Sequence, residues 1–233
     1  MMRDRLRDSL RLIHHSARTV AGRRFWLAPL LPPIWIAIQY FRVWIQWRTT
    51  SYDIVDAQNT LIGFPLIVLA IGLGVRIIAG EIDRRTLEIA YTVPGGAHRI
   101  WLAKLTAATL ILIVSEALLG LLTYLFCTEF PLSALYGALQ GAIFFMVLAM
   151  GVAALFKSES AGAMVTIGLF LLAWVLQGQR VSPFFNVELL ADLDAAERVA
   201  RLVQNRIGYL LAIAGVLLLS FGRAEQRERM LGG

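Results

Sequence analysis

Cysteine and lysine are scarce in this chain of 233 residues, which has one cysteine and two lysines. The single Cys127 excludes an internal disulfide and a metal site built from several thiolates. A phosphate-binding loop needs a lysine preceded by glycine and followed by serine or threonine. Lys104 follows alanine and Lys157 follows phenylalanine, so this chain cannot hydrolyse ATP by that route.

The motifs of familiar hydrolases are missing as well. The sequence contains no H-E-x-x-H zinc motif and no G-x-S-x-G nucleophile motif, and no pair of carboxylates lies inside an apolar run. These absences argue against a membrane-embedded hydrolase of a known kind. They predict that the chain is not an enzyme and has no catalytic, cofactor-binding or metal-binding residues of its own.

Long apolar runs dominate what is present. The chain is 58% hydrophobic and has a mean hydropathy of +0.67, and its apolar residues gather in runs of about 20, the length that crosses a bilayer core. The pattern predicts an all-α membrane protein with one membrane domain over 25–233. Its six transmembrane helices are expected at 25–47, 61–79, 105–126, 132–156, 161–177 and 207–221, with a short polar loop over 48–60 between the first two.

Two further helices are expected at the membrane surface. In 1–24, apolar residues recur at helical spacing with arginines on the other face, which predicts an interfacial amphipathic helix. A second, short amphipathic helix is predicted within 179–206, on the outer surface before the last span. Asn186 is its candidate cap, and Leu189 and Leu193 begin its apolar side.

Basic residues indicate how the chain is oriented. The net charge is +6, and the arginines cluster beside apolar runs, which is typical of topology signals facing anionic lipid and not of nucleic-acid binding. With the N-terminus inside, 15 basic residues face the cytoplasm and 5 face outward. We therefore expect a multi-pass protein of the inner (plasma) membrane with both termini in the cytoplasm.

A few polar residues fall inside the predicted spans and are candidates for a translocation path. Glu116 lies near the middle of the third span, where an ionised carboxylate is costly. It has three possible roles: pairing with an arginine or with Gln39 or Gln140, staying protonated and structural, or lining a substrate or proton route. Arg42 either extends toward the interface or faces the path.

The charged segment 80–104 lies between two apolar runs of membrane length. Residues 81–93 lack proline and glycine and predict a short helix at the cytoplasmic edge, which Pro94-Gly95-Gly96 ends. The segment either simply connects two spans or forms a rigid element that docks on another protein. The second interpretation is favoured because the chain lacks an energy source of its own.

The same segment carries a resemblance to a known family. The order Gly80-Glu81, Arg85-Thr86-Leu87-Glu88, Pro94, Arg99 and Lys104-Leu105 resembles the cytoplasmic segment of ABC-2 type transporter permeases. The basic N-terminal helix, the six spans and a Ser-Pro-Phe stretch (182–184) agree with that layout. One departure is Arg85, where glycine is commoner in the family.

The resemblance implies a permease subunit, usually of an exporter, that pairs with itself or with a sister permease. Two separate ABC ATPase subunits, which hold ATP and Mg²⁺, would dock on a coupling helix over 81–93. The residues implied in that coupling are Glu81, Arg84, Arg85, Leu87, Glu88 and Tyr91.

Two other functions stay open from the sequence. One is a membrane-embedded enzyme acting on lipid-like substrates, with Glu116 and Arg42 as candidate groups. The other is a membrane anchor subunit that does not transport. A neighbouring reading frame with a phosphate-binding loop would favour the permease.

Overall fold

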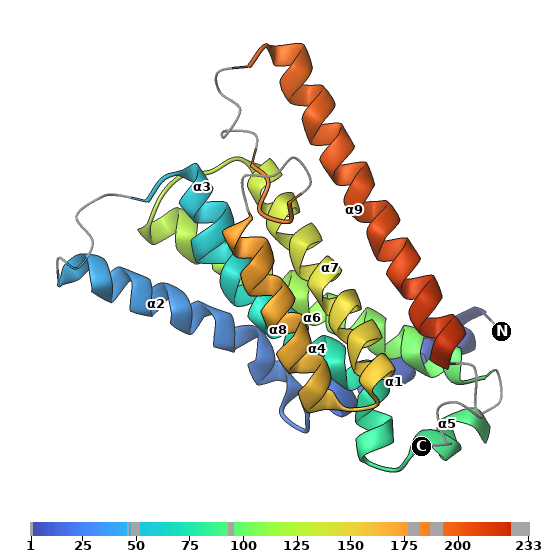
Figure 1. Cartoon of the computed structure of the whole chain (residues 1–233). Coiled ribbons are helices and arrows are strands. Elements are labelled where there is room, and N and C mark those ends of the chain that lie inside the picture. The colour runs from blue at the N-terminus through green and yellow to red at the C-terminus, as the bar shows by residue number, and fades with distance from the viewer. Residues whose placement is uncertain are drawn as a thin grey trace.

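The computed structural model describes residues 2–45, 47, 52–92, 96–176, 182–186 and 193–224, and these form helices without strands (Figure 1). In chain order the elements are α1 (Met2–Ala21), η1 (Phe25–Leu30), α2 (Leu31–Trp44), α3 (Ile54–Asp56), η2 (Ala57–Gly63), α4 (Phe64–Asp83), α5 (Leu87–Thr92), α6 (Ala97–Phe126), α7 (Leu132–Phe156), α8 (Glu159–Val175) and α9 (Ala195–Ala224). The predicted all-α class is confirmed.

Membrane character is supported by four helical stretches that are long and apolar enough to cross a bilayer. These are Ile54–Asp83, Ala97–Phe126, Leu132–Phe156 and Ala195–Ala224, and the 17-residue α8 is a shorter apolar helix. The predicted limits of the fourth span, 132–156, match α7.

The first predicted span, 25–47, is not one continuous helix. It divides into the six-residue 3₁₀ helix η1 and the 14-residue α2. Pro29 lies inside η1, and Pro32 and Pro33 lie in the first turn of α2. Proline lacks a backbone donor and is tolerated in a first turn, but it interrupts a helix further in, so the prolines set this division.

Two other predicted boundaries are corrected. Residues 54–60, predicted as part of a loop, are helical and lead through the π-helix η2 into α4, with the Asp53 carboxylate capping the start. The predicted outer helix and the last span are not separate, because α9 runs without a break over Ala195–Ala224. Leu189 lies outside the described residues.

α4 occupies the centre of the bundle (Figure 1), with 72% of its apolar stretch buried against 17% for that of α9. Its closest neighbour is α7, because a Cβ added to Gly74 would lie 2.2 Å from the Met146 carbonyl oxygen. A similar approach joins α7 to α8, where a Cβ on Gly162 would lie 2.4 Å from that of Ala153. Small residues thus let the helix backbones approach closely, as in other membrane bundles.

The N-terminal segment forms the predicted helix, α1, which packs against α6 and α4. Ala17 and Val20 belong to the buried core, whereas Arg11 and Arg18 are exposed. The last turns of α1 are therefore part of the bundle.

Candidate functional site

The predicted helix over 81–93 is wrong as a single helix, because the chain breaks at Arg85. The Arg85 amide donates to the Ile82 carbonyl at 2.9 Å, and the Thr86 amide donates to the Glu81 carbonyl at 2.8 Å. Arg85 has a φ of 56°, in the left-handed region. This is a Schellman ending, and it turns the chain sharply from α4 into α5.

Arginine is an unfavourable residue type for this left-handed backbone. Glycine takes this conformation without steric cost, which is the residue that the resemblance leads one to expect. A residue with a Cβ there costs about 1–2 kcal/mol, and the two terminal hydrogen bonds offset that cost. Because neither glycine nor proline marks the break, the sequence pattern does not reveal it.

Just before the break, a buried ion pair joins α4 to α6. The Lys104 ammonium donates to Glu81 Oε1 at 2.6 Å and to the Ile77 carbonyl at 3.2 Å, and the Trp101 indole donates to Glu81 Oε2 at 3.1 Å. Glu81 is 9% exposed and Lys104 is 5% exposed. Each charge is thus paired and hydrogen-bonded, as burial requires.

Two arginines of the same region hold the end of α1. Arg76 Nη1 donates to the Val20 carbonyl at 3.2 Å, and Arg84 Nη1 donates to the Thr19 carbonyl at 3.4 Å. The last carbonyls of a helix have no partner within it and carry a partial negative charge. Arg76 and Arg84 supply both the missing donors and the complementary charge.

The start of α8 is anchored to α4 by side chains of opposite sign. Arg76 Nε lies 3.5 Å from Glu159 Oε2, and the Glu159 amide donates to the Asp83 carboxylate at 3.0 Å. Ser158 caps the helix by accepting from the Ala161 amide at 3.4 Å. A carboxylate at a helix N-terminus is favoured by the helix dipole, so Asp83 fixes where α8 begins.

α5 connects this region to the end of α9. Leu87 is 3% exposed and belongs to the core, and the Tyr91 hydroxyl donates to the Ala224 carbonyl. The Trp101 ring lies between the rings of Tyr91 and Phe221, with centroids 6.3 and 6.0 Å away. Figure 1 shows α5 at the end of the bundle where α9 ends.

We call this region the α4–α5 corner, defined by Glu81, Arg84, Arg85, Leu87, Glu88 and Tyr91 with the partners Trp101 and Lys104. Its residues contact the ends of α1, α6 and α9. Of the six residues implied in coupling, Glu81 and Leu87 are buried and Tyr91 is half-buried. The surface available at the corner therefore consists of Arg84, Arg85 and Glu88, which are exposed.

The candidate path residues fall into separate polar groups. Gln39 Oε1 accepts from Arg42 Nη1 at 3.2 Å and from the Tyr52 hydroxyl at 3.2 Å. Gln140 Oε1 accepts from Arg206 Nη1 at 3.1 Å, and its amide donates to the Arg206 carbonyl at 2.9 Å. Gln140 thus joins α7 to α9 by hydrogen bonds, whereas Gln39 bonds within α2 and to the segment that precedes α3.

Glu116 is buried at 7% exposure on α6, and its Oε1 atom has no hydrogen-bond partner. Gln39 and Gln140, the partners considered from the sequence, bond instead to Tyr52 and Arg206. The predicted pairing of Glu116 with either glutamine is therefore not observed. Pairing of Glu116 with an arginine and its other two roles stay predictions.

A polar cluster at the opposite end of α4 was missed from the sequence. The Gln58 amide donates to the Phe185 carbonyl at 2.9 Å, and the Asn59 amide donates to the Phe184 carbonyl at 3.1 Å. Asn205 of α9 holds the same segment through the Ser182 carbonyl at 3.1 Å. The signal was the pair Gln58-Asn59 next to an apolar run, which had been assigned to a loop.

Comparison with protein-family models, with curated proteins and with solved structures finds no match to this chain. Within the described ranges, no three histidine, cysteine or carboxylate side chains are grouped so that they could hold a metal ion. The corner presents a small exposed charged surface backed by a buried ion pair.

Proposed function

We propose that this chain is the membrane-spanning permease subunit of an ATP-driven ABC-2 type transporter, an exporter energised by a separate ATPase. The ATPase docks on the exposed surface of the α4–α5 corner and carries the ATP and Mg²⁺. The bundle lies in the plasma membrane with the corner and both termini on the cytoplasmic side. The proposal combines the resemblance in segment 80–104 with the geometry of the corner.

The observation that carries the proposal is the attachment of the corner to several helices. A force applied at α5 reaches α4 and α6 through the Glu81–Lys104 pair. It reaches α9 through Tyr91 and α1 through Arg84. A loop that merely joined two spans would need no buried ion pair and no contacts to the ends of distant helices.

The charges left exposed suit a transient protein contact. Arg84, Arg85 and Glu88 lie on the outside of the corner and offer both signs within a short stretch. Charged groups at the rim of an interface steer association and fix register. Docking of this kind allows the ATPase to push on the corner without unfolding it.

A second permease subunit completes the proposed transporter. Only 17% of the apolar stretch of α9 is buried, and the N-terminal end of α9 diverges from the other helices (Figure 1). Such an apolar surface contacts lipid or another membrane helix. We propose that a second copy or a sister permease covers part of it.

The test reverses one charge at the corner. In a complex reconstituted with its ATPase, Glu88→Arg is expected to weaken docking tenfold or more, about 1.4 kcal/mol, and to lower substrate-stimulated ATPase activity in parallel. The matched control is Glu129→Arg, which reverses an exposed carboxylate in the α6–α7 connection at the opposite end of the bundle.

Both variants are first checked for insertion and for unchanged helix content. Normal docking and normal stimulation in Glu88→Arg would refute the role of the corner. An equal loss in Glu129→Arg would also count against it, because the effect would then not be local.

A further inference from the structure

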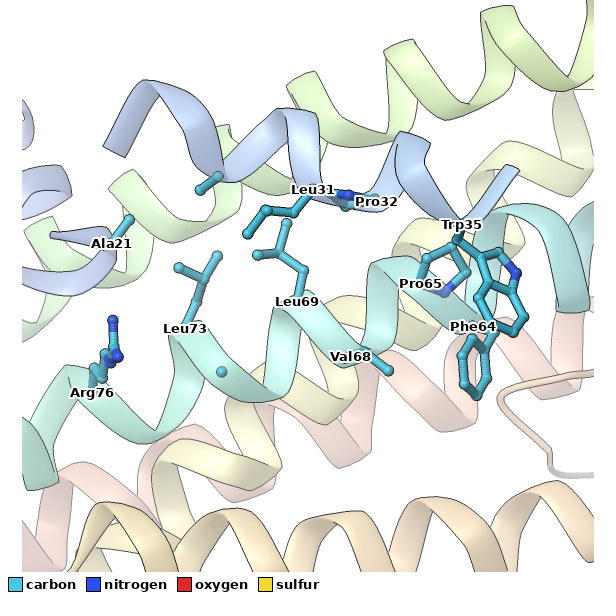
Figure 2. Close-up of a pocket in the computed structure, with 12 residues that line it drawn as sticks. Ala21, Leu31, Pro32, Trp35, Phe64, Pro65, Val68, Leu69, Leu73 and Arg76 are labelled. Carbon is cyan, nitrogen blue, oxygen red and sulfur yellow. The ribbon is translucent and has the colours of Figure 1, made fainter. Parts of the chain in front are cut away.

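An apolar groove runs between α4 and the η1–α2 segment (Figure 2). Its volume is about 430 Å³. Trp35, Phe64 and Pro65 line one end, Val68, Leu69 and Leu73 line the middle, and Arg76 lies at the other end. Arg76 is the only charged side chain among the lining residues described.

The charge is concentrated at the end of the groove that lies nearest the α4–α5 corner. The side chain of Arg76 is 45% exposed, and its described contacts use Nε and Nη1. A guanidinium has five N–H donors, so Nη2 keeps donors for an anionic oxygen. Arg23 and Arg24, both exposed, follow the lining residue Ala21 in the chain.

The length of the groove along α4 is close to the thickness of one membrane leaflet. From Phe64 to Arg76 the helix rises about 18 Å at 1.5 Å per residue, and half of a hydrocarbon core is about 15 Å. The groove is apolar along its length and charged at one end, and an anionic lipid likewise has an apolar chain of leaflet length and a phosphate at one end. Basic pockets between transmembrane helices bind such headgroups.

We propose that this groove holds one acyl chain of an anionic phospholipid, with the lipid phosphate against Arg76. Burying methylene groups along the apolar lining supplies the binding free energy. The guanidinium supplies the preference for an anionic headgroup. The site goes beyond the transport proposal, because it requires neither an ATPase nor a translocated substrate.

Gly72 provides a direct test, because it lines the groove and a Cβ added there would meet nothing within 4 Å. Leucine at this position fills the groove without a backbone clash. Gly168→Leu is the matched control, since Gly168 also faces open space but lies on α8, away from the groove. Both changes place leucine in an exposed helical position.

The experiment uses the whole chain in lipid nanodiscs with a phosphatidylglycerol that carries a photoreactive diazirine on its acyl chain. Illumination should label peptides containing Trp35, Phe64 or Val68. Gly72→Leu should reduce that labelling about tenfold through lost methylene burial, and Gly168→Leu should leave it unchanged.

The headgroup is tested with the matching phosphatidylcholine probe. The native chain should favour phosphatidylglycerol about fivefold, and Arg76→Gln should abolish that preference. Glu159→Gln removes the ion-pair partner of Arg76 but keeps the guanidinium, so the preference should persist or rise. Loss of preference in both variants would show a structural effect and overturn the assignment to Arg76.

Other outcomes also decide the question. Equal labelling of groove and outer-surface peptides would mean ordinary annular lipid and would overturn the proposal. Unchanged labelling in Gly72→Leu together with loss of a dimer would assign the groove to a second copy of the chain. Protection of the groove peptides by a native lipid of the same headgroup would support the proposal.

Discussion

Replacing Lys104 by methionine tests the most consequential contact in the bundle. Lys104→Met keeps the length of the side chain but removes its charge, which leaves the Glu81 carboxylate buried with only the Trp101 indole as a side-chain donor. Removing one partner of a buried ion pair costs about 3–5 kcal/mol. For a chain of this size that cost lowers the Tm by roughly 6–20 °C.

A double-mutant cycle separates the pair from its surroundings. In Glu81→Gln with Lys104→Met, both charges are gone and the glutamine oxygen still accepts from the Trp101 indole. Replacing a whole buried pair by neutral groups is often near neutral. We therefore expect the double variant to lie within about 1 kcal/mol of the native chain, more stable than either single variant.

The assay is thermal unfolding of the purified chain in detergent micelles, followed by circular dichroism and tryptophan fluorescence. Arg99→Met is the control, because Arg99 is an exposed cation on the same helix and should change stability by less than about 0.5 kcal/mol. A loss of stability below about 1 kcal/mol in Lys104→Met, or additive effects of the two changes in the cycle, would show that the Glu81–Lys104 ion pair does not stabilise the bundle as proposed.

Two predictions concern the backbone and use the same unfolding assay. Gly74→Ala should lower stability by about 1–3 kcal/mol, because its Cβ would lie 2.2 Å from the Met146 carbonyl oxygen. The control is Gly168→Ala, which faces open space and should be neutral or slightly stabilising. Equal effects of the two changes would contradict the close α4–α7 approach. Arg85→Gly should raise stability by about 0.5–1 kcal/mol, since relief of the left-handed strain exceeds the entropy cost of glycine. A loss of stability would mean that the arginine side chain contributes more to stability than the backbone strain costs.

Much of the architecture could be predicted because apolar runs mark the residues whose transfer out of water is favourable. The limits of α7 follow from an apolar stretch without charged residues after Pro131 and before Lys157, and the prediction of 132–156 matched them. The amphipathic spacing of 1–24 likewise predicted a helix, and α1 covers Met2–Ala21.

The predictions failed where a polar stretch joined an apolar one. Gln58 and Asn59 were assigned to a loop on polarity, yet they are helical and buried. Their partners, the carbonyls of Phe184 and Phe185, lie 125 or more residues away in the chain. Polarity alone does not show whether a side chain will find a buried partner, so it could not place this cluster.

Segment 80–104, which contains the candidate site, likewise shows what the sequence could predict and what it could not. The sequence alone determined that charged residues, among them Glu81, Glu88 and Lys104, lie in and beside the connection between two apolar runs. Only the tertiary structure decided that Glu81 faces inward onto Lys104 while Glu88 faces outward. The physical reason is that hydropathy is a property of each residue, whereas pairing a buried charge depends on which helix packs beside it.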